Sequence, residues 1–272
     1  MKKLGMIGIG NMGGAIVYGL LKKNVLPPDM ITVSDNDSER VKALSSELGI
    51  CVSTSNSALV EESEVIILAI KPHIVPTVLS DIKNKLSKSK LLISIALGVT
   101  LDGLSKMTDD RVRLMRCLPN TPALVNAGMT CVATCPETEE GDKEIVQKLF
   151  GAIGEVEFMP EELLGKMTPL TSSSPAYVFM FLEAMGDAAV QSGVPRKMAY
   201  RLAAQSVLGA AKMSLEANKH PGELKDMVCS PSGSTIEAVR YLEKNGFRSV
   251  VIEAMIESDI KAEYISKMSS DA

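Results

Sequence analysis

The feature that most restricts what this chain can fold into is a glycine pattern placed directly after an apolar run near the N-terminus. Residues 4–9 form that short apolar run, which is typical of a buried parallel strand. They overlap Gly8-Ile9-Gly10-Asn11-Met12-Gly13, which has the spacing G-x-G-x-x-G, and apolar residues at helical spacing follow from Ala15 to Leu20. Such glycines let the backbone approach a pyrophosphate, which the free N–H groups of the helix N-terminus then bind. The pattern therefore predicts a dinucleotide site at residues 8–13.

Strands and helices alternate through the first half of the chain. We expect further strands at residues 30–34, 50–52, 64–70, 91–95, 111–117 and 129–134, and helices at 38–48, between 52 and 64, and at 137–150. This alternation predicts an α/β fold, a Rossmann-like doubly wound sheet with ligands at the carboxyl ends of its strands. That edge brings together the glycine hexapeptide, Ser34, Ala69-Ile70-Lys71-Pro72 and the segment from Ala96 to Gly98.

Asp35 is a candidate for contact with the cofactor ribose. It ends the second predicted strand, about 20 residues after the last glycine of the pattern, where an acid accepts a ribose 2′-hydroxyl and disfavours a 2′-phosphate. Ser34, Asn36 and Arg40 lie close by in the sequence and would suit a phosphate instead. Asp35 would equally suit an N-cap-like turn. The choice between NADH and NADPH therefore stays open.

The second half of the chain has a different composition. From Pro160 onward Ala, Leu, Met and Ser dominate at helical spacing, and residues 177–190 are apolar almost all round. We predict a dinucleotide-binding domain of residues 1–159 and an all-helical C-terminal domain of residues 160–272. Helices this apolar need burial against another subunit, which predicts a homodimer.

Two helix starts in this half are rich in serine: Thr171 to Pro175, and SPSGST from Ser230 to Thr235. Capping alone would explain either one, because Ser and Thr side chains satisfy the first free N–H groups of a helix. The occurrence of two such starts in one helical domain favours ligand binding, with Ser174, Ser230, Gly233, Ser234 and Thr235 as the candidates.

Composition and charge exclude several classes of function. With 46% hydrophobic and 23% charged residues the chain is not disordered, and a net charge of −4 predicts no nucleic-acid partner. The longest uninterrupted apolar run after the N-terminus is too short to span a bilayer, so we expect no membrane association and a cytoplasmic location. Cys131 and Cys135 have no second Cys/His pair, so we predict no metal site and reduced thiols. For His73 and His220 we expect structural roles.

Taken together, these segments make the chain resemble the pyrroline-5-carboxylate reductase family, which catalyses the last step of proline biosynthesis. The resemblance covers nearly the whole length. Its carriers are the glycine hexapeptide, Ala69 to Pro72, Ser94 to Val99, Arg116 to Ala123, Pro175 to Tyr177 and, most specifically, HPGELKDMVCSPSGSTIEAV from His220.

The resemblance implies NADPH or NADH as cofactor and 1-pyrroline-5-carboxylate as substrate, reduced to proline. It implies that residues matching the glycine hexapeptide, Ser34, Asn56 and Ala69 to Pro72 contact the dinucleotide, and that residues matching Gly233 to Thr235 hold the substrate. It also implies a dimeric helical domain that completes each active site, often within larger rings of dimers such as decamers.

The chemistry of that substrate suits a Ser/Gly turn at a helix start. Its carboxylate matches backbone amides at a helix N-terminus, and its ring C=N bond takes a hydride at carbon and a proton at nitrogen. An imine is basic enough to be partly protonated near neutral pH, so no strong protein acid is needed. The Thr235 hydroxyl is the candidate catalytic group, since it can hydrogen-bond the nitrogen and relay a proton from water.

The chain departs from the family pattern at three places. Ser172-Ser173-Ser174 stands where the family usually has Gly-Ser-Gly, Asn218 where some members have a glutamate, and Ser232 where the late loop often has glycine. These departures affect pocket size and substrate affinity more than the class of reaction.

Three other functions compete with this one. A β-hydroxyacid dehydrogenase needs a lysine on its first long interdomain helix, and residues 167–195 contain none. A non-catalytic NAD(P)-sensing dimer would bind the cofactor without turnover, and the intact stretch from Ser230 to Thr235 argues against it. A reductase for another cyclic imino acid, such as the six-membered homologue, stays open.

Overall fold

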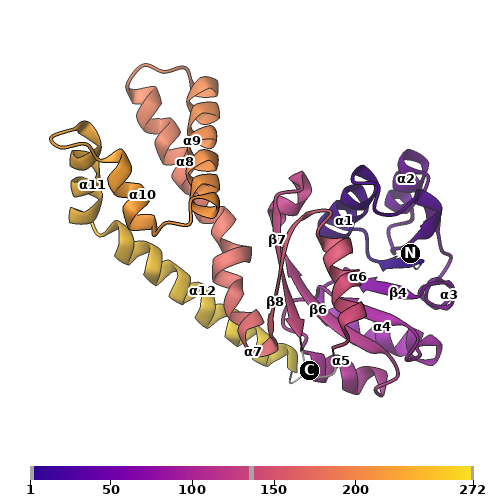
Figure 1. Cartoon of the computed structure of the whole chain (residues 1–272). Helices are drawn as coiled ribbons and strands as arrows, with labels where there is room; N and C mark the ends of the chain where they lie inside the picture. Colours follow the sequence, from indigo (N-terminus) through magenta and orange to yellow (C-terminus); the bar gives the residue numbers. More distant parts are fainter. Residues whose placement is uncertain (1–2, 135–137, 271–272) are drawn as a thin grey trace. The chain divides into compact units, whose positions relative to one another are not determined.

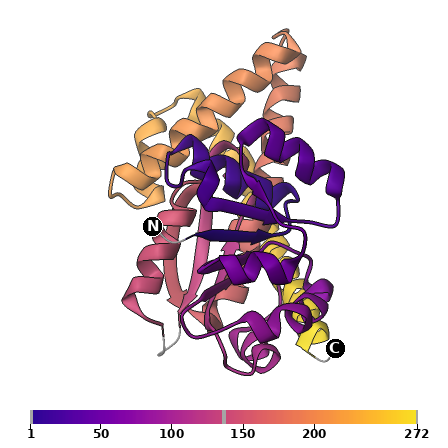
Figure 2. The same ribbon diagram turned by 90° about the vertical axis from the view of Figure 1, so that its right-hand side faces the viewer.

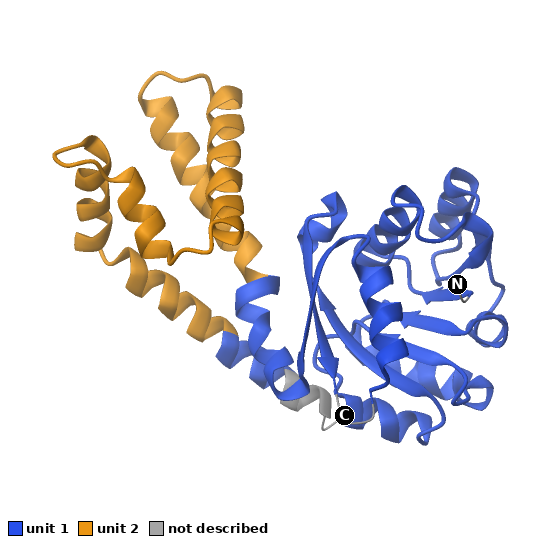
Figure 3. Ribbon diagram, in the orientation of Figure 1, with its two compact units in different colours: residues 1–172, 259–272 blue, residues 173–258 orange. Residues whose placement is uncertain are grey.

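The computed structural model describes residues 3–134 and 138–270, with side chains as far as residue 265. Two compact units divide the chain: unit 1 comprises residues 1–172 and 259–272, and unit 2 comprises residues 173–258 (Figure 3). Cys135 and Glu137, which enter the expectations above, lie outside the described residues.

Unit 1 contains an eight-stranded sheet in the order β3-β2-β1-β4-β5-β6-β7-β8. The strands are β1 (Leu4–Ile7), β2 (Ile31–Ser34), β3 (Cys51–Val52), β4 (Val65–Leu68), β5 (Leu91–Ser94), β6 (Arg113–Pro119), β7 (Gly128–Thr134) and β8 (Gly154–Pro160). Strands β1 to β6 all run parallel to one another, β7 is antiparallel to β6, and β8 is parallel to β7. The order reverses at β1, where β2 lies on one side and β4 on the other, and this is the switch point at which such sheets bind ligands. The predicted Rossmann-like fold is confirmed.

Helices cover both faces of this sheet (Figures 1 and 2). They are α1 (Asn11–Lys22), α2 (Ser38–Leu48), α3 (Asn56–Glu62), α4 (Val75–Ile82), α5 (Leu101–Thr108), α6 (Glu140–Phe150) and the short α7 (Glu161–Leu164). Side chains of α1, α2 and α6 belong to the same hydrophobic cluster as Ile67 of β4, while those of α3, α4 and α5 belong to the cluster that contains its neighbour Ile66. Both residues are fully buried, because consecutive side chains of a strand point to opposite faces and each face is covered.

Unit 2 consists of helices: α8 (Ser174–Gln191), α9 (Arg196–Glu216), α10 (Pro221–Val228), α11 (Ser234–Lys244) and the first half of α12 (Phe247–Ser270). Helices α8 and α9 approach closely because Gly186 has no side chain: a Cβ there would lie 2.4 Å from Cε1 of Tyr200. His220 caps α10, since its Nδ1 accepts a hydrogen bond from the N–H of Gly222 at 3.0 Å.

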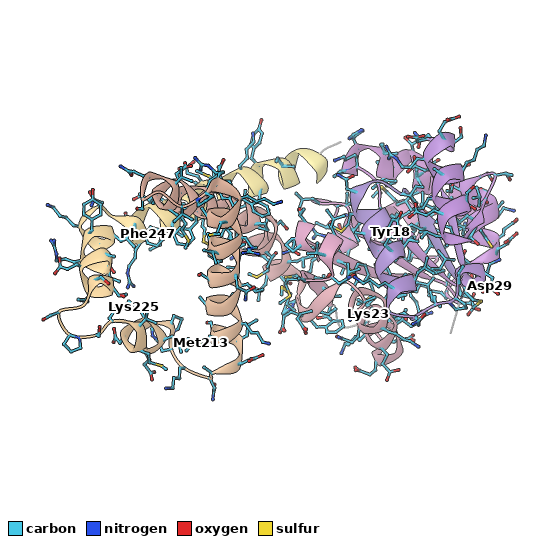
Figure 4. The ribbon with its side chains drawn as sticks, turned by 90° about the horizontal axis from the view of Figure 1, so that it is seen from above. Tyr18, Lys23, Asp29, Met213, Lys225 and Phe247 are labelled. Atoms are coloured by element: carbon cyan, nitrogen blue, oxygen red, sulfur yellow. The ribbon has the colours of Figure 1, made fainter. Side chains whose placement is uncertain are left out.

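Large apolar side chains project from the helices of unit 2 (Figure 4). Phe179 is 60% exposed and Met180 69% exposed. Others are Phe181, Leu202, Leu208, Met213, Leu215, Val250, Ile252 and Ile256. None of the described helices is long and apolar enough to cross a membrane.

Candidate active site

The loop between β1 and α1 owes its shape to glycines with two different physical roles. Gly8 has φ = +94°, and a Cβ there would lie 2.4 Å from the carbonyl oxygen of Ala69. A Cβ at Gly13 would lie 2.2 Å from the carbonyl oxygen of Gly8. A Cβ at Gly10 would meet no atom within 4 Å, so packing within the protein does not require glycine there. Gly8 and Gly13 thus hold the turn, and Gly10 leaves its outer side open to a phosphate.

The N-terminus of α1 faces outward at this loop. Gly10 is its N-cap, and no side chain caps the first N–H groups of the helix. With its 12 residues α1 directs the positive end of its dipole, and its free N–H groups, at whatever lies above Gly10. The residues present here fit a pyrophosphate.

Asp35 holds the glycine loop in place through hydrogen bonds to the backbone. Its Oδ2 accepts a hydrogen bond from the N–H of Ile9 at 2.8 Å, and its Oδ1 accepts one from the N–H of Asp37 at 2.9 Å. Beneath it, the hydroxyl of Ser34 donates to Oδ1 of Asn56 at 2.8 Å. The carboxylate therefore ties the turn after β2 to the glycine loop, which the sequence pattern did not reveal.

A cleft of about 770 Å³ runs along the carboxyl ends of the strands in unit 1. It gathers most of the predicted dinucleotide contacts: Gly8, Gly10, Asn11, Met12, Asp35, Ala69, Ile70, Lys71, Pro72 and Ala96. Gly13, Ser34 and Asn56 do not line it, and Ile9 lines a neighbouring groove together with Gly10 and Arg40. Eight further residues line the cleft: Asn36, Arg40, Ile74, Ile95, Leu97, Leu118, Pro119 and Thr121.

Ser172 also lines this cleft, from a segment whose conformation the sequence did not predict. Residues Thr168–Ser173 form a π-helix, a conformation that occurs frequently at functional sites. The side chain of Asn120 fixes it: Nδ2 donates to the carbonyl oxygen of Thr171 and Oδ1 accepts from the N–H of Met129, both at 2.8 Å. One amide side chain, directly after the end of β6, therefore links β7 to the π-helix.

The turn that precedes α11 belongs to unit 2. The N–H of Gly233 donates to the carbonyl oxygen of Ser230 at 3.0 Å, with Pro231 and Ser232 at the two central positions. Ser232 has φ = +59°, the left-handed region that glycine favours, and a positive φ at this position after proline is typical of a type II turn. A Cβ at Gly233 would lie 2.4 Å from Oγ of Ser230. The four residues from Ser230 to Gly233 thus form a compact turn directly before the first residue of α11.

Capping by the N-cap residue does not account for either serine-rich helix start. Gly233 is the N-cap of α11 and Ser173 that of α8, and neither helix has a side-chain capping bond. Thr235 is the second residue of α11 and is half-buried, while Ser230 and Ser234 are exposed. Ser174 is the first residue of α8. The N-cap residue of α11 therefore leaves the first N–H groups of this helix without a capping side chain.

Cys117 and Cys131 do not line the cleft. Burial raises the pKa of the Cys117 thiol and of the Cys131 thiol above the ordinary value, so neither is a thiolate nucleophile at neutral pH. Within residues 3–134 and 138–270, no group of three or more His, Cys, Asp or Glu side chains is placed to hold a metal ion.

Comparison with known proteins decides which family has this arrangement. Residues 161–264 match the family model described as pyrroline-5-carboxylate reductase dimerisation, and residues 3–98 match one described as NADP oxidoreductase, coenzyme F420-dependent. A pyrroline-5-carboxylate reductase of Escherichia coli is 48% identical over 98% of this chain and 99% of its own length. The chain belongs to the pyrroline-5-carboxylate reductase family.

Solved structures of this family share the whole fold. The pyrroline-5-carboxylate reductase of Coxiella burnetii is 32% identical and superposes with a TM-score of 0.90 over 97% of this chain and 98% of its own. The Plasmodium falciparum enzyme, solved with NADP bound, is 29% identical, with a TM-score of 0.85 over the same shares of the two chains. The match thus includes both the dinucleotide-binding half and the helical half of the family.

Proposed function

We propose that this chain is a pyrroline-5-carboxylate reductase, an NAD(P)H-dependent oxidoreductase that reduces the C=N bond of 1-pyrroline-5-carboxylate to give proline. The observation that carries the proposal is the match to the family over 98% of the chain, which includes the stretch from Ser230 to Thr235 in the helical half. A cofactor domain alone would leave the substrate open.

The residues present fit NADPH or NADH. Backbone amides of the glycine hexapeptide bind the pyrophosphate, and Ser34, Asp35 and Asn56 serve the adenosine side. Ala69, Ile70, Lys71, Pro72 and Ala96 continue the contact surface along the strand ends. When bound, the reduced nicotinamide supplies a hydride. Both carboxylate oxygens of Asp35 already accept hydrogen bonds from backbone N–H groups of the protein. Asn36 and Arg40, which line the cleft beside Asp35, suit the 2′-phosphate of NADPH.

For the imine we propose the turn before α11 and the start of α8. The N–H groups at the start of α11 bind the substrate carboxylate, with Ser230, Gly233, Ser234 and Ser174 completing the substrate site. Support comes from the uncapped start of α11 and from a turn that brings Ser230 against Gly233. The Thr235 hydroxyl hydrogen-bonds the ring nitrogen and passes it a proton from water, so a hydride at carbon and a proton at nitrogen complete the amine.

The larger organisation follows the same proposal. A dinucleotide-binding domain of residues 1–159 is joined to a helical domain of residues 160–272 that binds substrate and forms a homodimer. Larger rings of dimers, such as decamers, are the expected further assembly, and the cytoplasm is the expected location. The many large apolar side chains exposed on the helices of unit 2 support the dimer, since such exposure is typical of an interface.

The test is a spectrophotometric assay of NADPH and NADH oxidation by the purified protein. We expect oxidation only when 1-pyrroline-5-carboxylate is added, and a lower kcat/KM with the six-membered cyclic imine. Faster turnover of the six-membered imine would make the chain a reductase of another cyclic imino acid. Tight dinucleotide binding with no turnover of either imine would make it a non-catalytic NAD(P)-sensing protein.

A further inference from the structure

The hydroxyl of Ser172 is enclosed without a partner at one end of the dinucleotide cleft. Its Oγ is shielded from solvent and has no hydrogen-bond partner among the described residues. Ser172 itself lines the cleft. A buried hydroxyl without a partner costs free energy, so an enclosed one beside a binding cleft calls for an explanation.

The segment around it is held in place from two sides. The carbonyl oxygen of Thr171 accepts from Asn120, and the hydroxyl of Thr171 donates to the carbonyl oxygen of Met167 at 2.9 Å. The next hydroxyl, that of Ser173, pairs with the hydroxyl of Ser258 at 3.0 Å. Ser172 therefore stands between two satisfied hydroxyls on a backbone that hydrogen bonds hold, and rotation about its Cα–Cβ bond is the freedom left to its own hydroxyl.

The cleft has two chemically different ends. Asp35, Asn36 and Arg40 border one end, next to β2, where a Rossmann-like sheet holds the adenosine half of a dinucleotide. The end beyond β5 is bordered by apolar side chains and two hydroxyls: Ile95, Ala96, Leu97, Leu118, Pro119, Thr121 and Ser172. An apolar wall with few hydroxyls suits a flat ring that carries one polar substituent.

We propose that Ser172 is a binding residue for the nicotinamide half of the cofactor, with its hydroxyl hydrogen-bonded to the carboxamide group. A carboxamide offers both a donor and an acceptor, so either orientation of the hydroxyl satisfies both groups. The inference rests on the proposed function and extends it. Because the family usually has glycine here, the contact is a feature of this chain and not one that the resemblance implies.

The test compares two ligands that differ only at the nicotinamide end. The affinities of the wild type, Ser172→Ala and the matched control Ser173→Ala are measured by calorimetry for NADP⁺ and for 2′-phospho-ADP-ribose, which lacks the ring. We expect Ser172→Ala to weaken NADP⁺ binding roughly two- to tenfold, the loss of one neutral hydrogen bond. Its affinity for the fragment, and both affinities of Ser173→Ala, should stay at the wild-type values.

Three results would overturn the inference. Unchanged affinity for both ligands would mean that the hydroxyl does not touch the ring, and equal weakening of both would mean that Ser172 only maintains the shape of the cleft. A rise confined to the KM of the imine would assign the hydroxyl to the substrate. A wild type that binds no dinucleotide or reduces no imine counts against the proposed function instead, so the two failures are distinguishable.

Discussion

At the scale of single residues, the three glycines of the hexapeptide differ in whether the fold requires them. Gly8 and Gly13 are required by contacts within the protein, whereas Gly10 has φ = −61° and open space beside it. Any residue can adopt that φ. Packing within the protein therefore does not require glycine at position 10, and the proposed approach of a pyrophosphate would account for it.

We expect Gly10→Ala to keep the wild-type melting temperature within about 1–2 °C while weakening NADPH binding at least tenfold, because the new methyl group occupies the approach of the pyrophosphate. Gly13→Ala, in contrast, should lower both the melting temperature and the affinity, because its Cβ meets the carbonyl oxygen of Gly8. Calorimetry and NADPH fluorescence provide the two readouts. Normal NADPH affinity in Gly10→Ala would remove the pyrophosphate from this loop.

Thr235 is the residue on which the proposed proton transfer depends. Thr235→Ala should lower kcat/KM for the imine roughly ten- to hundredfold, since a hydrogen bond to a charged group contributes about 1.5–3 kcal/mol. Thr235→Ser keeps the hydroxyl and should retain most of the activity. Because the hydroxyl caps no helix, the melting temperature of both variants should match the wild type. An Ala variant as fast as the wild type would leave only the backbone amides of the turn as the substrate site.

At the scale of elements, the compact turn from Ser230 to Gly233 requires a strained backbone conformation at Ser232. Ser232 adopts φ = +59°, which costs a residue with a side chain about 1 kcal/mol. We expect Ser232→Gly to raise the free energy of unfolding by about 0.5–1 kcal/mol, measured as a higher urea midpoint at unchanged slope. Ser234→Gly, two residues later at the first position of α11, should lower the free energy of unfolding, because glycine is unfavourable in a helix. A destabilised Ser232→Gly would show that this serine makes a contact that offsets the strain.

The elements of unit 1 were largely predictable, because the spacing of apolar residues and the length of each segment identify buried strands such as β4 and amphipathic helices such as α2. β8 was not among the expected strands. Its exposed and half-buried residues alternate and include Glu155 and Glu157, so it lacks the apolar run of a strand covered on both faces. The π-helix was missed because no local signal distinguishes it from the first turn of α8. Its geometry depends on Asn120, which is 51 residues away from Thr171 in the chain.

Most candidate site residues were predictable, but their partners were not. The glycine spacing located the loop and the Ser/Gly stretch located the turn, because both are local patterns. Asp35 was expected at the ribose, and its bonds to Ile9 and Asp37 became visible only in the folded chain. Arg40 was already a candidate from its closeness to Asp35 in the sequence, whereas Ser172 lines the cleft through the packing of distant segments, for which a single sequence carries no direct signal.

At the scale of the whole molecule, the helices of unit 2 expose more large apolar side chains than a lone chain would keep in water. We expect light scattering to give the mass of two chains or a multiple of it. Met180→Glu, at a position 69% exposed, should shift the protein towards monomers, because a buried charge opposes association. Lys148→Glu, on the exposed side of α6, is the control and should leave the mass unchanged. A wild type that stays monomeric at micromolar concentration would contradict the proposed dimer.

The division into units was only partly visible in the sequence. The change of composition near residue 160 marks the start of the helical half. The last part of α12, however, groups with unit 1, although nothing in its local pattern sets it apart from the first part. Membership of a compact unit depends on contacts between residues that are far apart in the chain. Such contacts follow from packing and not from the local spacing of apolar residues.

The most direct test of the whole account follows the hydride itself. Purified protein is incubated with 1-pyrroline-5-carboxylate and NADPH deuterated at the transferable position of nicotinamide carbon 4, and the product is analysed by mass spectrometry and NMR. We predict proline that carries one deuterium at the δ-carbon, which is the former imine carbon, in equal amount to the NADP⁺ formed. Proline without the label, or NADPH bound and never oxidised, would contradict the account.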